Sequence, residues 1–295
     1  MELVLAGASG LIGSALAESL RADGHQVRTL VRRPASGPDV AQWDPAASRL
    51  DPAVLDGADA VVCLSGAGVG ERRWNDAVKR ELRASRVDPV GTIARTLAEH
   101  GGPRVLICAS AVGYYGDTGA TVVDEQAPAG DTFLAHLCEE WEAAADPARA
   151  AGLRVAHLRT GLVLTDRGGL LQRLSLLVKG GIGGRLGSGR QFMPWISLTD
   201  EVRAIRFVLE SELAGPVNLT GPAPVTNAEF TRTLGRVLNR PTVAVVPAFA
   251  ARAALGEFAN EVLIGQRARP RRLSDAGFEF RHGELETALR AELGR

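Results

Sequence analysis

A glycine-rich turn near the start of the chain constrains its fold more than any other feature. The apolar run Leu3-Val4-Leu5-Ala6 leads directly into Gly7-Ala8-Ser9-Gly10-Leu11-Ile12-Gly13, a helical apolar pattern continues to Gly24, and a second strand pattern covers 26–31. Strand, glycine turn, helix and strand in this order predict a dinucleotide-binding βαβ unit, because bare backbone lets a pyrophosphate approach the free N–H groups of the helix N-terminus. The alternative is a tight turn that needs glycines for its backbone alone.

Further strand and helix patterns alternate along the first half of the chain. Apolar strand patterns cover 58–64, 104–109 and 153–158, and helical patterns cover 131–145 and 74–100, the latter interrupted near Pro89. This alternation predicts an α/β fold, a Rossmann doubly wound parallel sheet, with ligands bound beyond the carboxyl ends of its strands.

The pattern changes near residue 166. Glycine-rich loops and helical patterns at 170–178, 200–210, 226–238 and 250–266 follow, and they predict a smaller, mostly helical C-terminal substrate lobe. We therefore expect a dinucleotide-binding domain over 1–165 and a substrate lobe over 166–295. The 217–219 run reads as a strand that returns to the main sheet, so residues of about 200–220 would rejoin the first domain.

Composition excludes several functional classes. With 34 basic and 34 acidic residues the formal net charge is zero, which argues against a nucleic-acid partner. No apolar run reaches about 18 residues, and the start of the chain has no basic leader, so neither a membrane partner nor export is predicted. Three widely spaced cysteines (Cys63, Cys108 and Cys138) indicate free thiols in the cytoplasm, and no histidine and cysteine spacing indicates a metal.

The end of the second strand indicates which dinucleotide binds. Folds that bind NAD usually place an Asp or Glu there to hold the ribose 2′-OH. This chain has Arg32 and Arg33, whose guanidinium groups match a 2′-phosphate. NADP(H) is therefore predicted, against the alternative of a solvated surface pair.

Polar and small residues follow two further strands. Ser65 and Gly66 come after the 58–64 strand, where they would let the cofactor approach the backbone, or would simply make a turn. Ser110 ends the 104–109 strand, and Tyr114 and Tyr115, the only two tyrosines, come shortly after it. Hydroxyl groups at this edge are where hydride transfer needs donors, although aromatic packing is an equal alternative for the tyrosines.

Together these motifs resemble the extended short-chain dehydrogenase/reductases. The resemblance is closest to the atypical, epimerase-family oxidoreductases that have a small C-terminal domain, and it covers nearly the whole chain. The motifs are GASGLIG at 7–13, ERRWNDAVKRELRASR at 71–86, SAVGYYGDTG at 110–119, FLAHLCEEWEAAA at 133–145, RTGLVL at 159–164, GSGRQFMPWISLTD at 187–200, TNAEF at 226–230 and GFEF at 277–280.

The resemblance implies an NADP(H)-binding Rossmann domain and roles for particular residues. Cofactor contacts are implied for Gly7, Gly10, Leu11, Ile12, Gly13, Arg32, Leu64, Ser65, Glu81, Arg86 and Val163, to which the glycine turn and strand ends add Ser9, Arg33 and Gly66. In related proteins the loop at 187–200 lines the substrate cleft, so Gln191, Phe192 and Trp195 are candidate substrate contacts, and Tyr115 is a further candidate. Pinning the two lobes together is an equal alternative for Phe192 and Trp195.

The usual catalytic set of this superfamily is incomplete. Its YxxxK pair places a tyrosine acid/base and a lysine on one helix, but the only lysines here are Lys79 and Lys179, and neither follows a tyrosine by four. With Glu142 as the helix anchor, the tyrosine and lysine positions hold Leu134 and Cys138. Ser110 alone matches, with Tyr114 the preferred replacement donor and Tyr115, His136 and Cys138 the others. A solvated histidine at His136 and a small buried side chain at Cys138 are the favoured alternatives for those two residues.

Three functions remain open from the sequence. The first is an NADP(H)-dependent oxidoreductase acting on a small, unidentified substrate, as a monomer or homodimer. The second is an NADPH-binding regulator without turnover. The third is a nucleotide-sugar epimerase, against which the missing YxxxK pair speaks because epimerisation through a ketone needs that proton relay.

Overall fold

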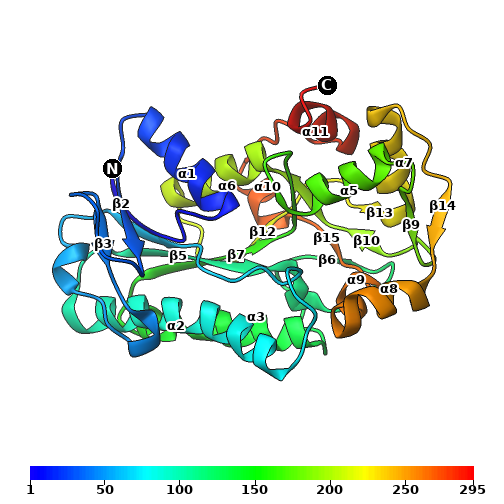
Figure 1. Cartoon of the computed structure of the whole chain (residues 1–295). Coiled ribbons are helices and arrows are strands. Elements are labelled where there is room, and N and C mark those ends of the chain that lie inside the picture. Colours follow the sequence, from blue (N-terminus) through cyan, green and yellow to red (C-terminus); the bar gives the residue numbers. More distant parts are fainter.

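A computed structural model describes all residues, 1–295, and places a seven-stranded sheet at the centre of the molecule (Figure 1). Every strand pair in this sheet is parallel, which confirms the predicted doubly wound α/β fold. In spatial order the strands are β12 (Gly215–Leu219), β7 (Arg154–Thr160), β5 (Val105–Ala111), β4 (Ala60–Cys63), β1 (Glu2–Ala6), β2 (Gln26–Val31) and β3 (Val40–Gln42).

Helices cover both faces of the sheet, and each face has its own apolar cluster. The cluster on one face includes Leu16 and Leu20 of α1 (Leu11–Ala22) and Ile205 of α6 (Leu198–Glu210). The cluster on the other face includes Val90, Ile93 and Leu97. The helices on that side are α2 (Asp76–His100), α3 (Phe133–Ala143) and α4 (Asp146–Ala150).

The predicted interruption of the helix at Pro89 is wrong, because α2 runs unbroken from Asp76 to His100. A proline inside a helix costs about 3 kcal/mol. Pro89, Val90 and Ile93 are all buried, and their packing against the sheet offsets this cost.

The C-terminal lobe has a third apolar cluster, formed mainly by three helices. These are α5 (Gly169–Lys179), α7 (Asn227–Leu238) and α11 (Leu285–Glu292), while α10 (Arg271–Asp275) packs beside β12. Short two-stranded pairs complete the lobe: β8 (Leu162–Leu164) with β11 (Trp195–Ser197), β9 (Gly184–Leu186) with β14 (Ala244–Val246), β10 (Phe192–Met193) with β13 (Val225–Thr226), and β6 (Val122–Val123) with β15 (Arg267–Ala268).

The single helix predicted over 250–266 is also wrong. The chain forms α8 (Ala248–Leu255), a 3-10 turn η4 (Gly256–Phe258) and α9 (Ala259–Val262). Gly256 has a φ of 61°, a left-handed conformation that ends α8 and that glycine adopts without a steric penalty.

Candidate functional site

The glycine turn lies at the carboxyl edge of the sheet and approaches the end of β4 closely. Gly7 has a φ of 86°, and a Cβ atom there would lie 2.6 Å from the carbonyl carbon of Leu64. A Cβ atom on Gly13 would lie 2.2 Å from the carbonyl oxygen of Gly7. Gly10 begins α1 with no side-chain hydrogen bond, and the first turn has no acidic residue. The helix N-terminus is therefore bare and suited to a diphosphate.

A buried cation lies beside the loop that follows β4. Arg86 of α2 is only 9% exposed, and its guanidinium donates hydrogen bonds to the carbonyl oxygens of Ala67 (2.9 Å) and Leu82 (3.0 Å). It has no carboxylate partner, and burial lowers its pKa. A Cβ atom on Gly66 would meet this side chain at 3.4 Å, so the predicted Leu64–Gly66 segment and Arg86 lie together.

The other predicted cofactor residues occupy different environments. Arg32 and Arg33 are exposed after β2 and make no ion pair; Arg33 donates one hydrogen bond, to the Ser36 hydroxyl. Glu81 lies on the exposed side of α2, where it is ion-paired with Arg72. The arginines are free to meet a phosphate, whereas the Glu81 carboxylate already has a partner.

Ser110 takes part in a buried ionic network that the sequence analysis did not identify. Its hydroxyl donates a hydrogen bond to Oε1 of Glu142 (2.7 Å). The same carboxylate binds Arg159 through two parallel contacts of 2.8 and 2.9 Å. The Arg159 side chain holds the pKa of Glu142 below its usual range despite the opposing effect of burial. Charged residues inside the motifs at 133–145 and 159–164 were the only signal for this pair.

The two tyrosines have different roles in this network. The Tyr115 hydroxyl donates to Asn218 (2.7 Å) and accepts from Arg159 (3.1 Å), and burial raises its pKa to about 12. Its hydroxyl is therefore held between two protein groups. Tyr114 is half-buried, and its ring centroid lies 3.4 Å from the guanidinium carbon of Arg159.

The remaining candidate proton donors are poorly suited to the role. Cys138 is buried with its Sγ 3.6 Å from the carbonyl oxygen of Ala111, and burial raises its pKa to about 12. His136 is exposed and lies 3.4 Å from Asp131. Leu134 and Cys138 stand where YxxxK would place a tyrosine and a lysine, so α3 offers only an apolar side chain and a buried thiol of raised pKa at these positions.

The predicted substrate residues have different partners in the structure. Beside them, the predicted cofactor residue Val163 pairs with Ile196 between β8 and β11. Gln191 donates to the carbonyl oxygen of Leu186, and the Phe192 ring lies under the Arg267 guanidinium at 4.8 Å. Trp195 is 1% exposed in the core of the C-terminal lobe, so its predicted contact with a substrate is not supported. Its indole N–H is satisfied by Ala223.

The sequence analysis also did not identify a buried carboxyl group on α6. Glu201 has no exposed surface, and one of its oxygens accepts a hydrogen bond from Thr160 (2.8 Å) at the end of β7. Its other oxygen has no partner, and burial raises the pKa to about 8. Its neighbours in sequence look like an ordinary helix start, so nothing in the pattern marked it.

The comparisons with known proteins agree with this architecture. The "NAD dependent epimerase/dehydratase family" matches residues 3–220, and a "domain of unknown function (DUF1731)" matches residues 246–292. Epimerase family protein Mb2239 of Mycobacterium bovis is 52% identical over 97% of this chain and 96% of its own length. Epimerase family protein SDR39U1 of Homo sapiens is 34% identical over 98% and 99%.

A solved structure of a relative matches the whole molecule. The crystal structure of human epimerase family protein SDR39U1 (isoform 2) with NADPH superposes with a TM-score of 0.90 at 33% identity, covering 100% of both chains. None of the helices described above combines the length and hydropathy of a membrane span. On the extent of these matches, the chain belongs to the NAD dependent epimerase/dehydratase family.

Proposed function

We propose that this protein is an NADP(H)-dependent oxidoreductase that transfers hydride to or from a small substrate at the carboxyl edge of the sheet. The observation that supports this most is the bare N-terminus of α1 at the glycine turn, with the buried, carboxylate-free Arg86 beside the neighbouring loop. NADPH in the human relative supports the same choice of cofactor. The three free cysteines suit a reducing compartment such as the cytoplasm.

The residues of this edge divide among the parts of the cofactor. Backbone N–H groups of the glycine turn would meet the diphosphate, and Arg32 and Arg33 the 2′-phosphate. Leu64, Ser65 and Gly66 would border the cofactor after β4 with Arg86 beside them, and Val163 would border it after β7. Glu81 would contact the cofactor only if its ion pair with Arg72 were broken. The glycine-turn residues concerned are Gly7, Ser9, Gly10, Leu11, Ile12 and Gly13.

Ser110 is the best-placed group for proton handling. When bound, the cofactor supplies hydride chemistry, and the protein must orient the substrate and balance its proton. Because Ser110 donates its own proton to Glu142, its lone pairs are free to accept a hydrogen bond from a substrate hydroxyl. Tyr114 remains our candidate for the second hydroxyl, since its neighbour Tyr115 has both partners within the protein.

The test has two stages. Fluorescence titration should show that NADPH binds more tightly than NADH. Anaerobic oxidation of NADPH should then be followed against a panel of carbonyl and enone substrates, with Ser110→Ala as the matched variant. We expect Ser110→Ala to bind NADPH like the parent protein but to lose turnover. NADPH binding without turnover of any substrate would contradict the oxidoreductase proposal.

A second candidate is a regulator that binds NADPH without consuming it. It is favoured by Leu134 and Cys138 in the usual acid/base positions and by the high pKa of Tyr115. Affinity capture with the full chain, with and without NADPH, separates the two proposals. A partner retained only with NADPH, together with no turnover, would favour the regulator.

A further inference from the structure

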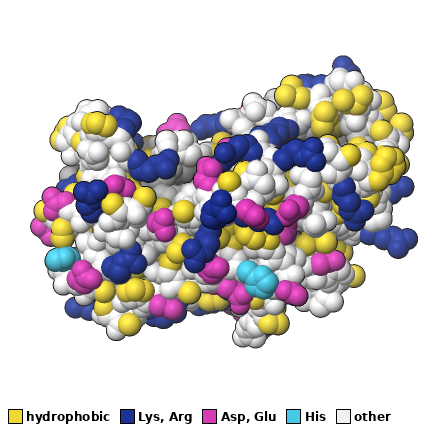
Figure 2. All heavy atoms as spheres, turned by 60° about the horizontal axis from the view of Figure 1, so that its bottom comes forward, with side chains coloured by type: hydrophobic (Ala, Val, Ile, Leu, Met, Phe, Trp, Pro, Cys, Tyr) yellow, Lys and Arg dark blue, Asp and Glu magenta, His cyan; other side chains and the backbone are white.

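Exposed apolar side chains are concentrated at one end of the C-terminal lobe. Six of the eight large apolar residues that are exposed in the chain belong to α5, the loop after it, the segment around β14 and the start of α8. Figure 2 shows apolar side chains gathered at this right-hand end of the molecule, where Figure 1 places β14 and α8. We call this set the distal apolar face: Leu176, Leu177, Ile182, Val243, Val245 and Phe249.

These side chains come from segments that adjoin one another. Ile182 N–H donates to the carbonyl oxygen of Leu177, which closes the end of α5. The following strand, β9, pairs with β14 in a register that sets Ala244 against Gly184, so Val243 and Ile182 lie at the same end of the pair. Val243 is 90% exposed. Monomeric proteins rarely expose several large apolar side chains on neighbouring segments, so this face is expected to contact a binding partner.

The segments that form this face are rich in basic residues. Segments 167–199 and 230–256 contain nine basic residues and no acidic residue, although Asp166, Asp200, Glu229 and Glu257 stand directly beyond their ends. Only Arg167 and Arg236 pair with carboxylates, which belong to other segments. The other seven make no ion pair: Arg173, Lys179, Arg185, Arg190, Arg232, Arg240 and Arg252.

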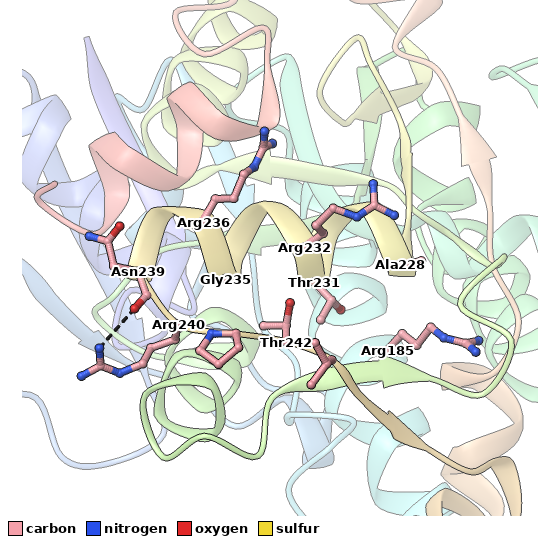
Figure 3. Close-up of a pocket in the computed structure, with 11 residues that line it drawn as sticks. Arg185, Ala228, Thr231, Arg232, Gly235, Arg236, Asn239, Arg240 and Thr242 are labelled. Atoms are coloured by element: carbon pink, nitrogen blue, oxygen red, sulfur yellow. Dashed lines mark hydrogen bonds between the residues drawn. The ribbon is translucent and has the colours of Figure 1, made fainter.

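A hollow of about 590 Å³ lies between α7 and the chain that leads into β14. Four arginines line it, with the hydroxyl groups of Thr231 and Thr242 and with Val243 of the distal apolar face. In Figure 3, Arg232 and Arg236 project from α7, while Arg185 and Arg240 lie at opposite ends of the hollow. No acidic side chain lines the hollow, but Arg236 is already paired with Glu286 at 3.2 Å, so Arg185, Arg232 and Arg240 are the cations open to an anionic group.

The charge distribution decides between the occupants of this face. A second copy of the chain seated on the same face would bring two basic surfaces together, which is unfavourable. Apolar side chains surrounded by unpaired cations match the interface of an anionic bilayer, where headgroup phosphates lie directly above acyl chains. We propose that the distal apolar face binds the surface of an anionic phospholipid membrane and that the hollow receives a lipid phosphate.

Such peripheral contact needs no membrane-spanning helix. The sequence predicts no membrane partner because it shows neither a spanning segment nor a basic leader. A contact with the membrane surface requires neither. The residues of the distal apolar face are also different from those proposed to bind the cofactor, although α5 begins beside Leu11 of the glycine turn. Membrane binding and NADPH binding can therefore fail separately in experiments.

Vesicle sedimentation with the full-length protein tests the proposal. Vesicles of equal parts phosphatidylglycerol and phosphatidylcholine should bind it, and phosphatidylcholine alone should not. Ile182→Ser with Val243→Ser should weaken binding at least about tenfold. Arg232→Ala with Arg240→Ala should weaken it about fivefold for each charge removed. Val122→Ser, an exposed apolar residue on β6, is the matched control and should bind like the parent protein.

Three outcomes would overturn the proposal. The first is no binding to the anionic vesicles at low ionic strength, which would leave an acidic protein as the partner that suits this face. The second is a loss of binding in Val122→Ser equal to that in the face variants. The third is unchanged binding of the Ile182→Ser with Val243→Ser variant to the anionic vesicles, since this would mean that the protein adsorbs by charge alone. Unchanged NADPH titration in each variant shows that the protein is folded.

Discussion

Arg159 illustrates how one side chain organises the candidate site. Its guanidinium meets Glu142 on α3, the Tyr115 hydroxyl and the face of the Tyr114 ring. The sequence indicated Ser110, the glycine turn and Arg32 as candidates, because each belongs to a local motif. It did not indicate the ion pair, because Glu142 and Arg159 meet only after α3, α4 and β7 have packed.

Removing one member of this pair should destabilise the fold. We expect Glu142→Ala to lower the free energy of unfolding by about 3 kcal/mol, because the Arg159 guanidinium would remain buried without a counter-charge. Denaturant unfolding measures the change. Asp146→Ala, which breaks the exposed pair with Arg149, should cost less than about 1 kcal/mol. Equal losses in the free energy of unfolding for the two substitutions would show that the buried pair contributes no more to stability than the exposed pair.

Glu201 should make stability depend on pH. Its pKa is about 8 in the folded protein against an ordinary 4.5, so the folded state holds the proton more tightly than the unfolded state. Stability should therefore fall as pH rises from 4.5 toward 8. Glu201→Gln should remove this dependence and raise the free energy of unfolding near pH 8 by about 2 kcal/mol.

Thermal unfolding across that pH range provides the measurement for Glu201. Glu210→Gln, at the exposed end of the same helix, is the matched control and should retain the pH dependence of the parent protein. If the Glu201→Gln and parent curves run parallel, the buried carboxyl does not titrate as described.

The arginines after β2 should determine which cofactor is preferred. Arg32→Ala with Arg33→Ala should weaken NADPH binding by at least about tenfold, because charge-assisted hydrogen bonds to the 2′-phosphate are lost. NADH binding should be unchanged, since it has no phosphate at that position. Calorimetric titration with both nucleotides measures this. Arg104 directly precedes β5 and so lies at the amino ends of the strands, away from the proposed cofactor site. Arg104→Ala should therefore change neither affinity.

At the scale of elements, local sequence rules fail where distant packing intervenes. A proline predicts an interruption, yet α2 is unbroken because its central residues are buried against the sheet. An Ala-rich amphipathic stretch predicts one long helix, yet Gly256 divides it so that Phe258 and α9 can reach α2 and α3. There Phe258 packs on Trp74, with ring centroids 5.2 Å apart, and Glu261 accepts hydrogen bonds at the start of α3.

We expect Phe258→Ala to loosen this attachment without unfolding the protein. Amide hydrogen exchange in 248–262 should become at least about tenfold faster, because the segment would open locally. Exchange in β1, β4 and β5 should remain slow. Phe249→Ala lies in the same segment but removes an exposed ring, so its exchange should match the parent protein. Faster exchange throughout the sheet would mean that the segment does not open as a separate unit.

At the scale of the whole molecule, the two sequence regions are interleaved. The first 165 residues provide six strands of the main sheet, but β12 and α6 come from beyond that boundary. The sequence suggested a return near 217–219 from two apolar residues, Val217 and Leu219, on either side of Asn218. The packing of α6 against α1 explains why the return is needed, since α6 and β12 both contribute to the cluster on that face.

Fragments can test this interleaving. A fragment of residues 1–165 should unfold without a cooperative transition, because β7 would have an open edge and one face of the sheet would lose the cover of α6. A fragment of residues 1–220 contains all seven strands and should recover a cooperative transition. Circular dichroism during urea unfolding distinguishes them. Cooperative unfolding of the shorter fragment would support a domain boundary at 165.

The contact between Lys79 and Glu257 has a practical consequence. Lys79 and Lys179 are the only lysines, so an amine-reactive reagent can modify just two side chains and the amino terminus. One lysine lies where the C-terminal segment meets α2, and the other ends α5 beside the distal apolar face. Mass spectrometry of the labelled protein would therefore report on both regions in one experiment, without any engineered probe.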